Sequence, residues 1–313
     1  MRRQSSTQRG AALLTAMLIV SLVASLAAAM VWRQYRAVQI EAAERARAQS
    51  GWILLGALDW ARLILREDAR ANRSEPVDSL SEAWATPLAE ARLSTFLAAD
   101  KSNTDDGPEA FLSGSIADAQ ARYNLRNLLA GTEMPALELR TLQRLCESAG
   151  LPTNTATQLA TALRAAWAAP SETTALRPQN IDQLAWLGLS RETIERLRPF
   201  VTLLPQPTAV NLNTAPREVI AALADGLDLA SAERIVQQRQ SQPLKSLAVA
   251  LSLMPAGVTL GEQRAAVNSA FFLVSGRLRL DQRVVEERWL VQRRELEVLV
   301  LQRQRVNLSL GSP

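Results

Sequence analysis

The hydrophobic pattern begins with a ten-residue polar leader, MRRQSSTQRG, followed by an uncharged and mostly apolar run from Ala11 to Trp32. As a helix rising about 1.5 Å per residue, this run would be about 33 Å long, enough to cross the hydrocarbon core of a bilayer. Arg2, Arg3 and Arg9 precede the run. Because basic residues stay on the cytoplasmic side, we expect a single-pass anchor with the rest of the chain exported.

A cleavable secretory signal is the alternative interpretation of this segment. A basic start, an apolar run and the small residues Ala27-Ala28-Ala29 fit such a signal, whose mature chain would begin at Met30. The apolar pattern nevertheless continues through Trp32 and passes into a helical mixture of polar and apolar residues. The sequence therefore favours an anchor that is also the first half of one long helix ending near Arg70.

The middle of the chain, residues 123–265, has helical periodicity and a weak repeat. Gly150-Leu151, Gly188-Leu189 and Gly226-Leu227 lie 38 residues apart, each between two apolar helical segments. This spacing predicts helix hairpins joined by tight glycine turns. We expect an all-helical insert of two small bundles, 123–205 and 206–261, resembling SAM-like or helix-hairpin-helix units. Ser190 and Thr214 are the predicted helix N-caps.

Strand patterns flank this insert. Val274, Gly276, Leu278 and Leu280 alternate with polar residues, which is typical of a half-buried strand. Two further strands are predicted over 285–291 and 296–301, after a turn at 281–282, and an earlier one over 115–125. An antiparallel sheet packed on the C-terminal half of the long helix follows, so the fold class is α+β. Residues 33–122 would hold the helix and the first part of this head, and 266–313 its C-terminal strands, with a frayed tail from 307.

Composition excludes several kinds of chemistry. The 313 residues include no histidine and one cysteine, Cys146, so His-dependent catalysis, an internal disulfide and zinc sites made of His or Cys pairs are ruled out. We expect Cys146 to be a buried structural thiol and the chain to be no enzyme. The net charge is +4, and the positive charge is nearly all arginine, spread along the chain among acidic residues. We interpret these arginines mainly as solvated faces and donors to salt bridges between subunits, and the strongest local cluster, Arg293-Arg294, lies in a predicted strand.

A polar loop from Asp100 to Pro108 carries the weak candidates for a metal site, Asp100, Asp105 and Asp106. Carboxylates and carbonyls are the ligands that calcium prefers. The loop lacks the spacing of a known calcium loop, and a solvated turn is the favoured interpretation.

The leader and the apolar run resemble the class III signal of type IV pilins and type II secretion pseudopilins. The resemblance implies that a prepilin peptidase cuts between Gly10 and Ala11 and that Ala11 becomes N-methylated. Two positions depart from the family pattern: Ala11 stands where Phe or Met is usual, and Thr15 stands where Glu is usual. A carboxylate inside a membrane persists only when something compensates its cost. In the family, that Glu pairs with the N-terminal amine of a neighbouring subunit, and Thr15 cannot form this pair.

Absence of the Glu marks the K-type minor pseudopilins, which occupy the filament tip, and three further stretches resemble that group. They are Trp84-Ala85-Thr86-Pro87, the run from Ile116 to Leu128, and Val210-Asn211-Leu212-Asn213-Thr214-Ala215. The resemblance implies an inner-membrane protein with a periplasmic head that enters the pseudopilus after processing. It also implies a role in initiating assembly and supporting the export of folded proteins. The implied partners are the I- and J-type minor pseudopilins, the major pseudopilin, the prepilin peptidase and the inner-membrane assembly platform, and calcium is a possible ligand. Exposed apolar positions between Tyr35 and Leu65 are our candidates for partner contact.

A DNA receptor of competence type is the second hypothesis. The Val210–Ala215 stretch followed by Gly226 resembles the helix-hairpin-helix of such outward-facing anchored proteins. These hairpins hold phosphate with backbone amides of a Gly-x-Gly turn. Here Asp228 replaces the second glycine, and its carboxylate would repel a phosphate. The sequence therefore favours scaffold hairpins over a nucleic-acid site.

Overall fold

The computed structural model describes residues 9–93, 110–168, 176–280 and 283–306. Most of the leader, the candidates Asp100, Asp105 and Asp106, the turn at 281–282 and the tail from 307 lie outside the described residues. The chain divides into two compact units, residues 1–55 and 56–313.

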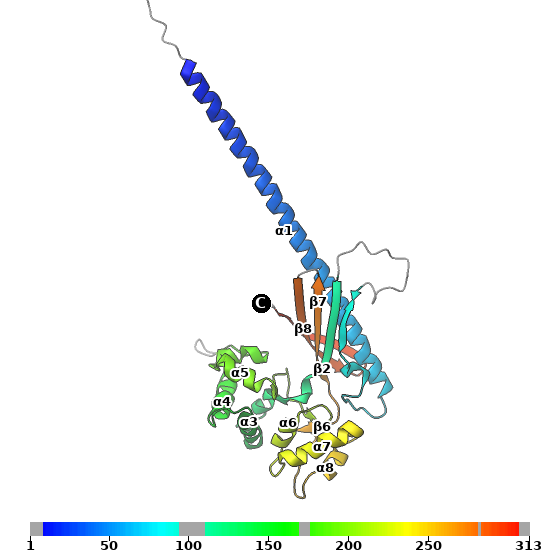
Figure 1. Ribbon diagram of the computed structural model, residues 1–313. Coiled ribbons are helices and arrows are strands. Elements are labelled where there is room, and N and C mark those ends of the chain that lie inside the picture. Colours follow the sequence, from blue (N-terminus) through cyan, green and yellow to red (C-terminus); the bar gives the residue numbers. More distant parts are fainter. Residues whose placement is uncertain (1–8, 94–109, 169–175, 281–282, 307–313) are drawn as a thin grey trace, which may run out of the picture. The chain divides into compact units, whose positions relative to one another are not determined.

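One helix, α1 (Arg9–Ala71), runs through the first unit and into the second (Figure 1). It ends one residue beyond the predicted Arg70. Its first part is rich in Ala and Leu, which are strong helix formers, and the helix continues through Gly51 and Gly56. The hydroxyl of Ser21 donates to the carbonyl of Met17 and that of Ser25 to Ser21, so these polar groups are satisfied inside the helix. Such a helix exposes almost no unpaired polar group along its apolar run.

The second unit contains a five-stranded antiparallel sheet in the order β1-β2-β7-β8-β9. The strands are β1 (Leu88–Arg92), β2 (Ala110–Asp118), β7 (Phe271–Leu280), β8 (Arg283–Arg294) and β9 (Glu297–Val306). The three C-terminal strands confirm the prediction. The strand predicted over 115–125 was wrong in its bounds. Asp118 ends β2 because its carboxylate accepts the backbone N–H of Gln120 and starts the short helix η2 (Ala119–Ala121).

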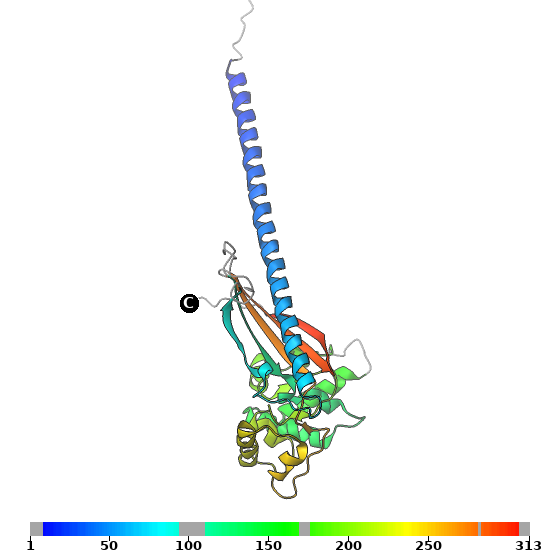
Figure 2. The ribbon, with the colours of Figure 1, turned by 90° about the vertical axis from the view of Figure 1, so that its right-hand side faces the viewer.

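One face of the sheet packs against the part of α1 that lies in the second unit (Figure 2). That part of the helix buries Leu58, Ala61 and Leu65, and Arg62 Nε donates to the carbonyl oxygen of Val298 at 2.9 Å. The sheet contributes every second residue, as a half-buried strand should. These buried residues are Leu112, Val274, Leu278, Trp289, Val291 and Val298.

The insert lies between β2 and β7 and is not purely helical. Two parallel two-residue pairings occur in it: β3 (Tyr123–Asn124) with β4 (Val201–Thr202), and β5 (Val210–Asn211) with β6 (Ala265–Ala266). Hydrophobic periodicity could not predict them because each strand is only two residues long. The helices are η3 (Leu125–Leu129), α3 (Ala136–Ser148), α4 (Thr155–Trp167), η4 (Ile181–Leu187), α5 (Arg191–Leu197), α6 (Arg217–Ala222), α7 (Leu229–Ser241) and α8 (Leu247–Ser252).

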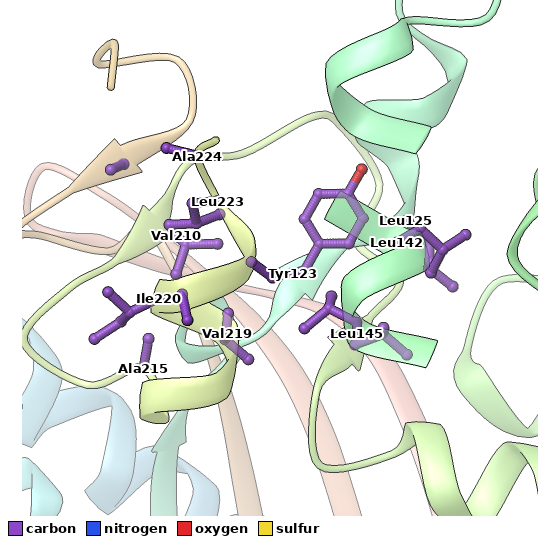
Figure 3. Close-up of a cluster of buried hydrophobic side chains, with 14 of the residues drawn as sticks. Tyr123, Leu125, Leu142, Leu145, Val210, Ala215, Val219, Ile220, Leu223 and Ala224 are labelled. Atoms are coloured by element: carbon purple, nitrogen blue, oxygen red, sulfur yellow. The ribbon is translucent and has the colours of Figure 1, made fainter. Parts of the chain in front are cut away.

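Residues from both predicted bundles share one hydrophobic core. Tyr123, Leu142 and Leu145 from the first pack beside Val210 and Ile220 from the second (Figure 3). The two halves of the insert are therefore one packed body.

Glycines make the turns between paired helices, as predicted. Gly150, Gly188 and Gly226 have φ of +66°, +88° and +80°, the left-handed region that glycine occupies without a Cβ penalty. The hydroxyl of Ser190 accepts the backbone N–H of Thr193, which confirms its predicted N-cap role. The prediction for Thr214 was wrong: Pro216 is the residue that precedes α6, and the Thr214 hydroxyl points to a carboxylate instead.

Candidate functional site

The start of α1 carries the predicted processing and assembly positions. Thr15 Oγ1 donates to the carbonyl oxygens of Ala11 and Ala12, each at 3.0 Å, so the hydroxyl is satisfied inside its own helix. Among the described residues α1 is long and apolar enough to cross a membrane, and its most apolar 18-residue window is fully exposed. Thr15 offers no charge to a neighbour. Cleavage between Gly10 and Ala11 stays a prediction.

The apolar positions of α1 between Tyr35 and Leu65 fall into two groups. Tyr35, Val38 and Trp52 are exposed, with Trp52 at 74% exposure the most open of the three. Leu58 and Leu65 are buried in the head. Only the exposed group remains a candidate for contact with a partner.

The first motif, around Trp84, lies against the sheet. Trp84 belongs to the short helix η1 (Ala83–Ala85), and its ring meets that of Phe272 edge-on with centroids 5.3 Å apart. Its Nε1 donates to Glu82 Oε2 at 2.6 Å, and the backbone N–H of Ser79 donates to the same oxygen at 3.0 Å. The Trp84 motif therefore fixes the segment that follows α1 onto β7.

Three carboxylates meet beside this motif. Asp68, Asp78 and Glu82 each offer an oxygen within 4.8 Å of the others. Arg293 reaches into the group: its Nη1 donates to Asp68 at 2.7 Å, and its Nη2 donates to both oxygens of Asp78 at 2.5 and 2.7 Å. Because Arg293 pairs with Asp68 and Asp78, and Glu82 Oε2 accepts from Trp84 and Ser79, these three carboxylates do not fit a calcium ion. Burial nevertheless raises the pKa of Asp68 to about 6, and burial also raises the pKa of Glu82.

Arg293 corrects the interpretation of the arginines as solvated groups. Its side chain is 11% exposed, and its guanidinium carbon lies 4.9 Å from the centre of the Phe272 ring. Nη2 also donates to the carbonyl oxygen of Ser269 at 3.0 Å. Arginine suits this place because its planar group donates in several directions at once.

Asp118 belongs to the Ile116–Leu128 stretch and bonds to residues of the Val210–Ala215 stretch. It is buried, and its carboxylate accepts four hydrogen bonds, from the backbone N–H of Gln120 and from the side chains of Asn211, Thr214 and Ser269, at 2.6 to 2.9 Å. Burial raises the pKa of Asp118, and these bonds oppose the rise. The carboxylate therefore ties the end of β2 to β5 of the insert.

Hydrogen bonds connect Asp118 and its partners to the group formed by Asp68, Asp78 and Glu82. Asp78 Oδ2 accepts the backbone N–H of Ser269 at 2.7 Å, and the carbonyl oxygen of Asp78 accepts from Asn211 at 3.0 Å. We call this set the polar junction. It comprises Asp68, Asp78, Asp118, Asn211, Thr214, Ser269 and Arg293.

Other residues of the Ile116–Leu128 stretch also bond across the boundary between the sheet and the insert. Gln120 accepts the backbone N–H of Ala270 at 2.7 Å and donates to the carbonyl of Ala209 at 3.0 Å. Asn124 accepts the backbone N–H of Leu204 and donates to the carbonyl of Gln206. The motifs found in the sequence are thus largely buried polar groups that satisfy one another, as buried polar groups must.

Sequence reasoning missed Asp78, Ser269 and Arg293. Arg293 was visible as a charge at the same strand parity as Trp289 and Val291, two buried apolar residues of β8. A charge on the apolar face of a strand indicates a buried partner.

The geometry does not form the phosphate site of a DNA-binding hairpin. Asn211, Asn213 and Thr214 are buried in the head. Asp228 accepts the backbone N–H of Ser231 at 2.7 Å and caps α7, so a carboxylate already occupies the helix start where a phosphate would sit. This observation counts against the second hypothesis.

Cys146 is buried, as predicted. Burial raises the pKa of its thiol to about 12, so little thiolate forms at neutral pH.

Comparisons with known proteins agree with this arrangement. Two family models described as Type II secretion system (T2SS), protein K match residues 121–206 and 210–268. The type II secretion system protein K of Pseudomonas aeruginosa is 30% identical over 95% of this chain and 89% of its own length. The proteins of the same name from Klebsiella pneumoniae and Pectobacterium carotovorum subsp. carotovorum are 28% and 27% identical, and each match covers at least 95% of both chains.

A solved structure has the same fold. In the crystal structure of the GspK-GspI-GspJ complex from enterotoxigenic Escherichia coli, one chain aligns with a TM-score of 0.65 and 18% identity. The alignment covers 85% of this chain and 98% of that one. The likeness confirms the predicted pilin-like α+β architecture.

Proposed function

Because this chain belongs to the protein K family of type II secretion systems, we propose that it is the minor pseudopilin at the pseudopilus tip. In this role it helps to initiate assembly with other minor pseudopilins and supports the export of folded proteins across the outer membrane. The observation that carries the tip position is Thr15, whose hydroxyl is bonded within its own helix and whose side chain carries no charge. A subunit without an acidic group there has no means of pairing with the amine of a subunit ahead of it.

The insert supports the same position. It extends the head by a body with its own hydrophobic core, held to the sheet by the polar junction. Such a body on the head would obstruct a further subunit from stacking beyond it. At the filament tip no further subunit has to stack there, so the insert does not hinder assembly.

We further propose that α1 is an inner-membrane anchor before assembly, with the head in the periplasm. A prepilin peptidase cuts after Gly10, and the freed helix then buries its apolar surface against other pseudopilin helices as the filament forms. The chain performs no covalent chemistry itself. Intact mass measurement of the membrane-extracted protein tests the processing step: a chain beginning at methylated Ala11 agrees with it, and one beginning at Met30 indicates a secretory signal.

The partners follow from the solved neighbour, which was crystallised with GspI and GspJ. We propose that this chain binds the I- and J-type minor pseudopilins of its own system, and through them the major pseudopilin and the inner-membrane assembly platform. Tyr35, Val38 and Trp52 are exposed apolar residues of α1 suited to such contacts. Co-purification of the three minor pseudopilins from detergent extracts tests this proposal, and loss of the complex in a Trp52→Glu variant would locate the contact.

Calcium has no place in this proposal. The candidates Asp100, Asp105 and Asp106 lie outside the described residues. In the part of the chain that the structure covers, Arg293 pairs with Asp68 and Asp78, two of the three carboxylates in the acidic group with Glu82.

A further inference from the structure

Strand β9 forms one edge of the sheet, and β8 is its only partner strand among the described residues. In an antiparallel pair, the backbone groups of successive residues face the partner strand and the outside in turn. Arg62 Nε donates to the carbonyl oxygen of Val298 at 2.9 Å, so the backbone of Val298 faces outward, and that of Val300 faces the same way. In the part of the chain that the structure describes, the N–H groups of these two valines have no hydrogen-bond partner.

The second half of β9 is protected against pairing with another strand. Arg303 and Arg305 both bond to Glu287, which places charged side chains along this half. Gln302 Nε2 donates to the carbonyl oxygen of Gln179, so a segment of the insert contacts this half as well. A bulge just before Gln302 shifts the register with β8. Charges, bulges and covering segments are the usual protection of an edge strand.

The first half of β9, Glu297–Leu301, lacks this protection, and we call it the apolar edge. Leu299, Val300 and Leu301 are consecutive apolar residues that are 37%, 42% and 37% exposed. Glu297 is the one charged residue of this half. An edge that combines exposed apolar side chains with unpaired N–H groups is a template for pairing with another strand.

A groove of about 460 Å³ lies between the apolar edge and the part of α1 beside it (Figure 2). Two acidic and two basic residues line this groove, so its formal charge is zero. Arg62 pairs with Asp59 at 2.9 Å, and Leu63 is 37% exposed. A strand beside β9 would direct every second side chain toward this groove. The lining residues are all described, and they are Asp59, Arg62, Leu63, Arg66, Leu296, Glu297, Val298 and Leu299.

We propose that an extended segment of a different polypeptide, with uncharged and mainly apolar side chains, adds to the sheet as a strand beside the apolar edge. Outward-facing backbone groups at every second residue match the repeat of another extended backbone. Apolar side chains on that segment would form cross-strand pairs with Leu299 on one face of the sheet and Val300 on the other. The neutral groove gives no reason for a polyanion to bind. The proposal adds a contact on the head to the tip role and does not depend on the exposed residues of α1 argued above.

A second copy of this chain does not fit as the occupant. Two identical edges pair antiparallel about a two-fold axis, which reverses the direction of every element along the sheet. The parts of α1 that pack on the two sheets would then run in opposite directions. Two chains anchored through α1 in one membrane, as proposed above, cannot adopt this arrangement.

In-cell photocrosslinking tests the proposal in the full-length chain within its own secretion system. A benzophenone side chain replaces Leu299, and a control places it at Gln304, an exposed residue in the protected half of the same strand. Mass spectrometry identifies the crosslinked peptide. Val300→Pro removes an outward N–H that β8 does not use, so it should lower the yield at position 299 by about tenfold. Val300→Thr keeps the N–H and a branched side chain, and it should leave the yield unchanged.

A third variant, Val300→Lys, keeps the N–H and blocks strand pairing by its charge, so it tests the proposal even if the proline variant does not fold. The expected result is an adduct with an uncharged, apolar-rich segment of another protein that both Val300→Pro and Val300→Lys abolish. The proposal is overturned by no adduct above the Gln304 control, by an adduct within this chain or with a second copy, by a peptide rich in charged residues, or by equal yields in the lysine and threonine variants.

Co-purification of the I- and J-type pseudopilins with the unsubstituted chain is measured in parallel. A failure of the tip role would show there, separately from the crosslink at position 299.

Discussion

At the scale of single residues, Arg293 holds the head together most directly. Its guanidinium contacts Asp68 on α1, Asp78 in the segment that follows, and the backbone of Ser269 before β7. Removing one partner from a buried ion pair leaves the other charges without compensation. The residue therefore links three separate parts of the chain.

We predict that Arg293→Met destabilises the head by about 3 to 5 kcal/mol, because Asp68 and Asp78 stay buried and lose their counter-charge. Urea unfolding of the detergent-solubilised chain measures the change. Arg294→Met is the matched control: Arg294 is exposed and bonds to its neighbour Gln292, so its loss should cost less than about 0.5 kcal/mol. Equal effects of the two substitutions would contradict the role given to Arg293.

Asp68 should make stability depend on pH in an unusual direction. Its pKa is about 6 in the folded protein against an ordinary 3.8, so between these values the native state holds more protons than the unfolded one. Stability should therefore fall as pH rises from about 4 to about 6 and level off above that. The raised pKa values of Glu82 and Asp118 act in the same direction.

Melting temperatures of the parent chain and of Asp68→Asn, taken from pH 4 to 7, measure this effect. The substitution should flatten the fall between pH 4 and 6. Asp59→Asn, an exposed carboxylate on the same helix, should leave the slope as it is. A slope that Asp68→Asn leaves unchanged would show that this carboxyl titrates normally.

Thr15 should be replaceable. Its hydroxyl bonds only to carbonyls of its own helix among the described residues, so Thr15→Val removes no contact to a neighbour. We predict unchanged secretion of an exported protein, measured in the culture medium, in cells carrying this variant. A loss of secretion with normal amounts of the protein in the membrane would show that the hydroxyl serves another subunit.

Residue roles were predicted with mixed success, for a physical reason. Ser190 was identified because capping depends on local sequence. Thr214 has the same local pattern, but a buried carboxylate from β2 competes for its hydroxyl. A contact between residues 96 positions apart in sequence leaves no local signal.

At the scale of elements, the glycine turns of the insert were predictable because a left-handed φ strongly favours one residue type. The five-stranded sheet was predicted in its C-terminal half, where alternation runs over ten residues or more. β1 and the parallel pairs were not, because strands of two to five residues carry too few positions to show a period.

We predict that Gly188→Ala destabilises the insert by about 1 to 2 kcal/mol through backbone strain alone. A Cβ at this position would meet nothing within 4 Å, but φ is +88°. Gly261→Ala is the control, since that glycine also has open space around it and no left-handed φ. Thermal unfolding compares the two variants. A Gly261→Ala variant as unstable as Gly188→Ala would mean that lost space or flexibility, and not the turn conformation, sets the cost.

At the scale of the whole molecule, the chain combines a long apolar helix with a head that carries an extra helical body. The sequence showed the helix through an uncharged run and the head through the strand alternation. The sequence does not show how the sheet is joined to the insert, because Asp118, Asn211 and Ser269 come together only in the folded chain. Family resemblance marked two of these three residues before their contacts were known.

Native mass spectrometry of the detergent-extracted minor pseudopilins tests the central claim most directly. We predict a complex with one copy each of this chain and of the I- and J-type pseudopilins, in which this chain starts at methylated Ala11. A chain that keeps its ten-residue leader, or one that is isolated without either partner from cells that make all three, would contradict the assignment to the pseudopilus tip.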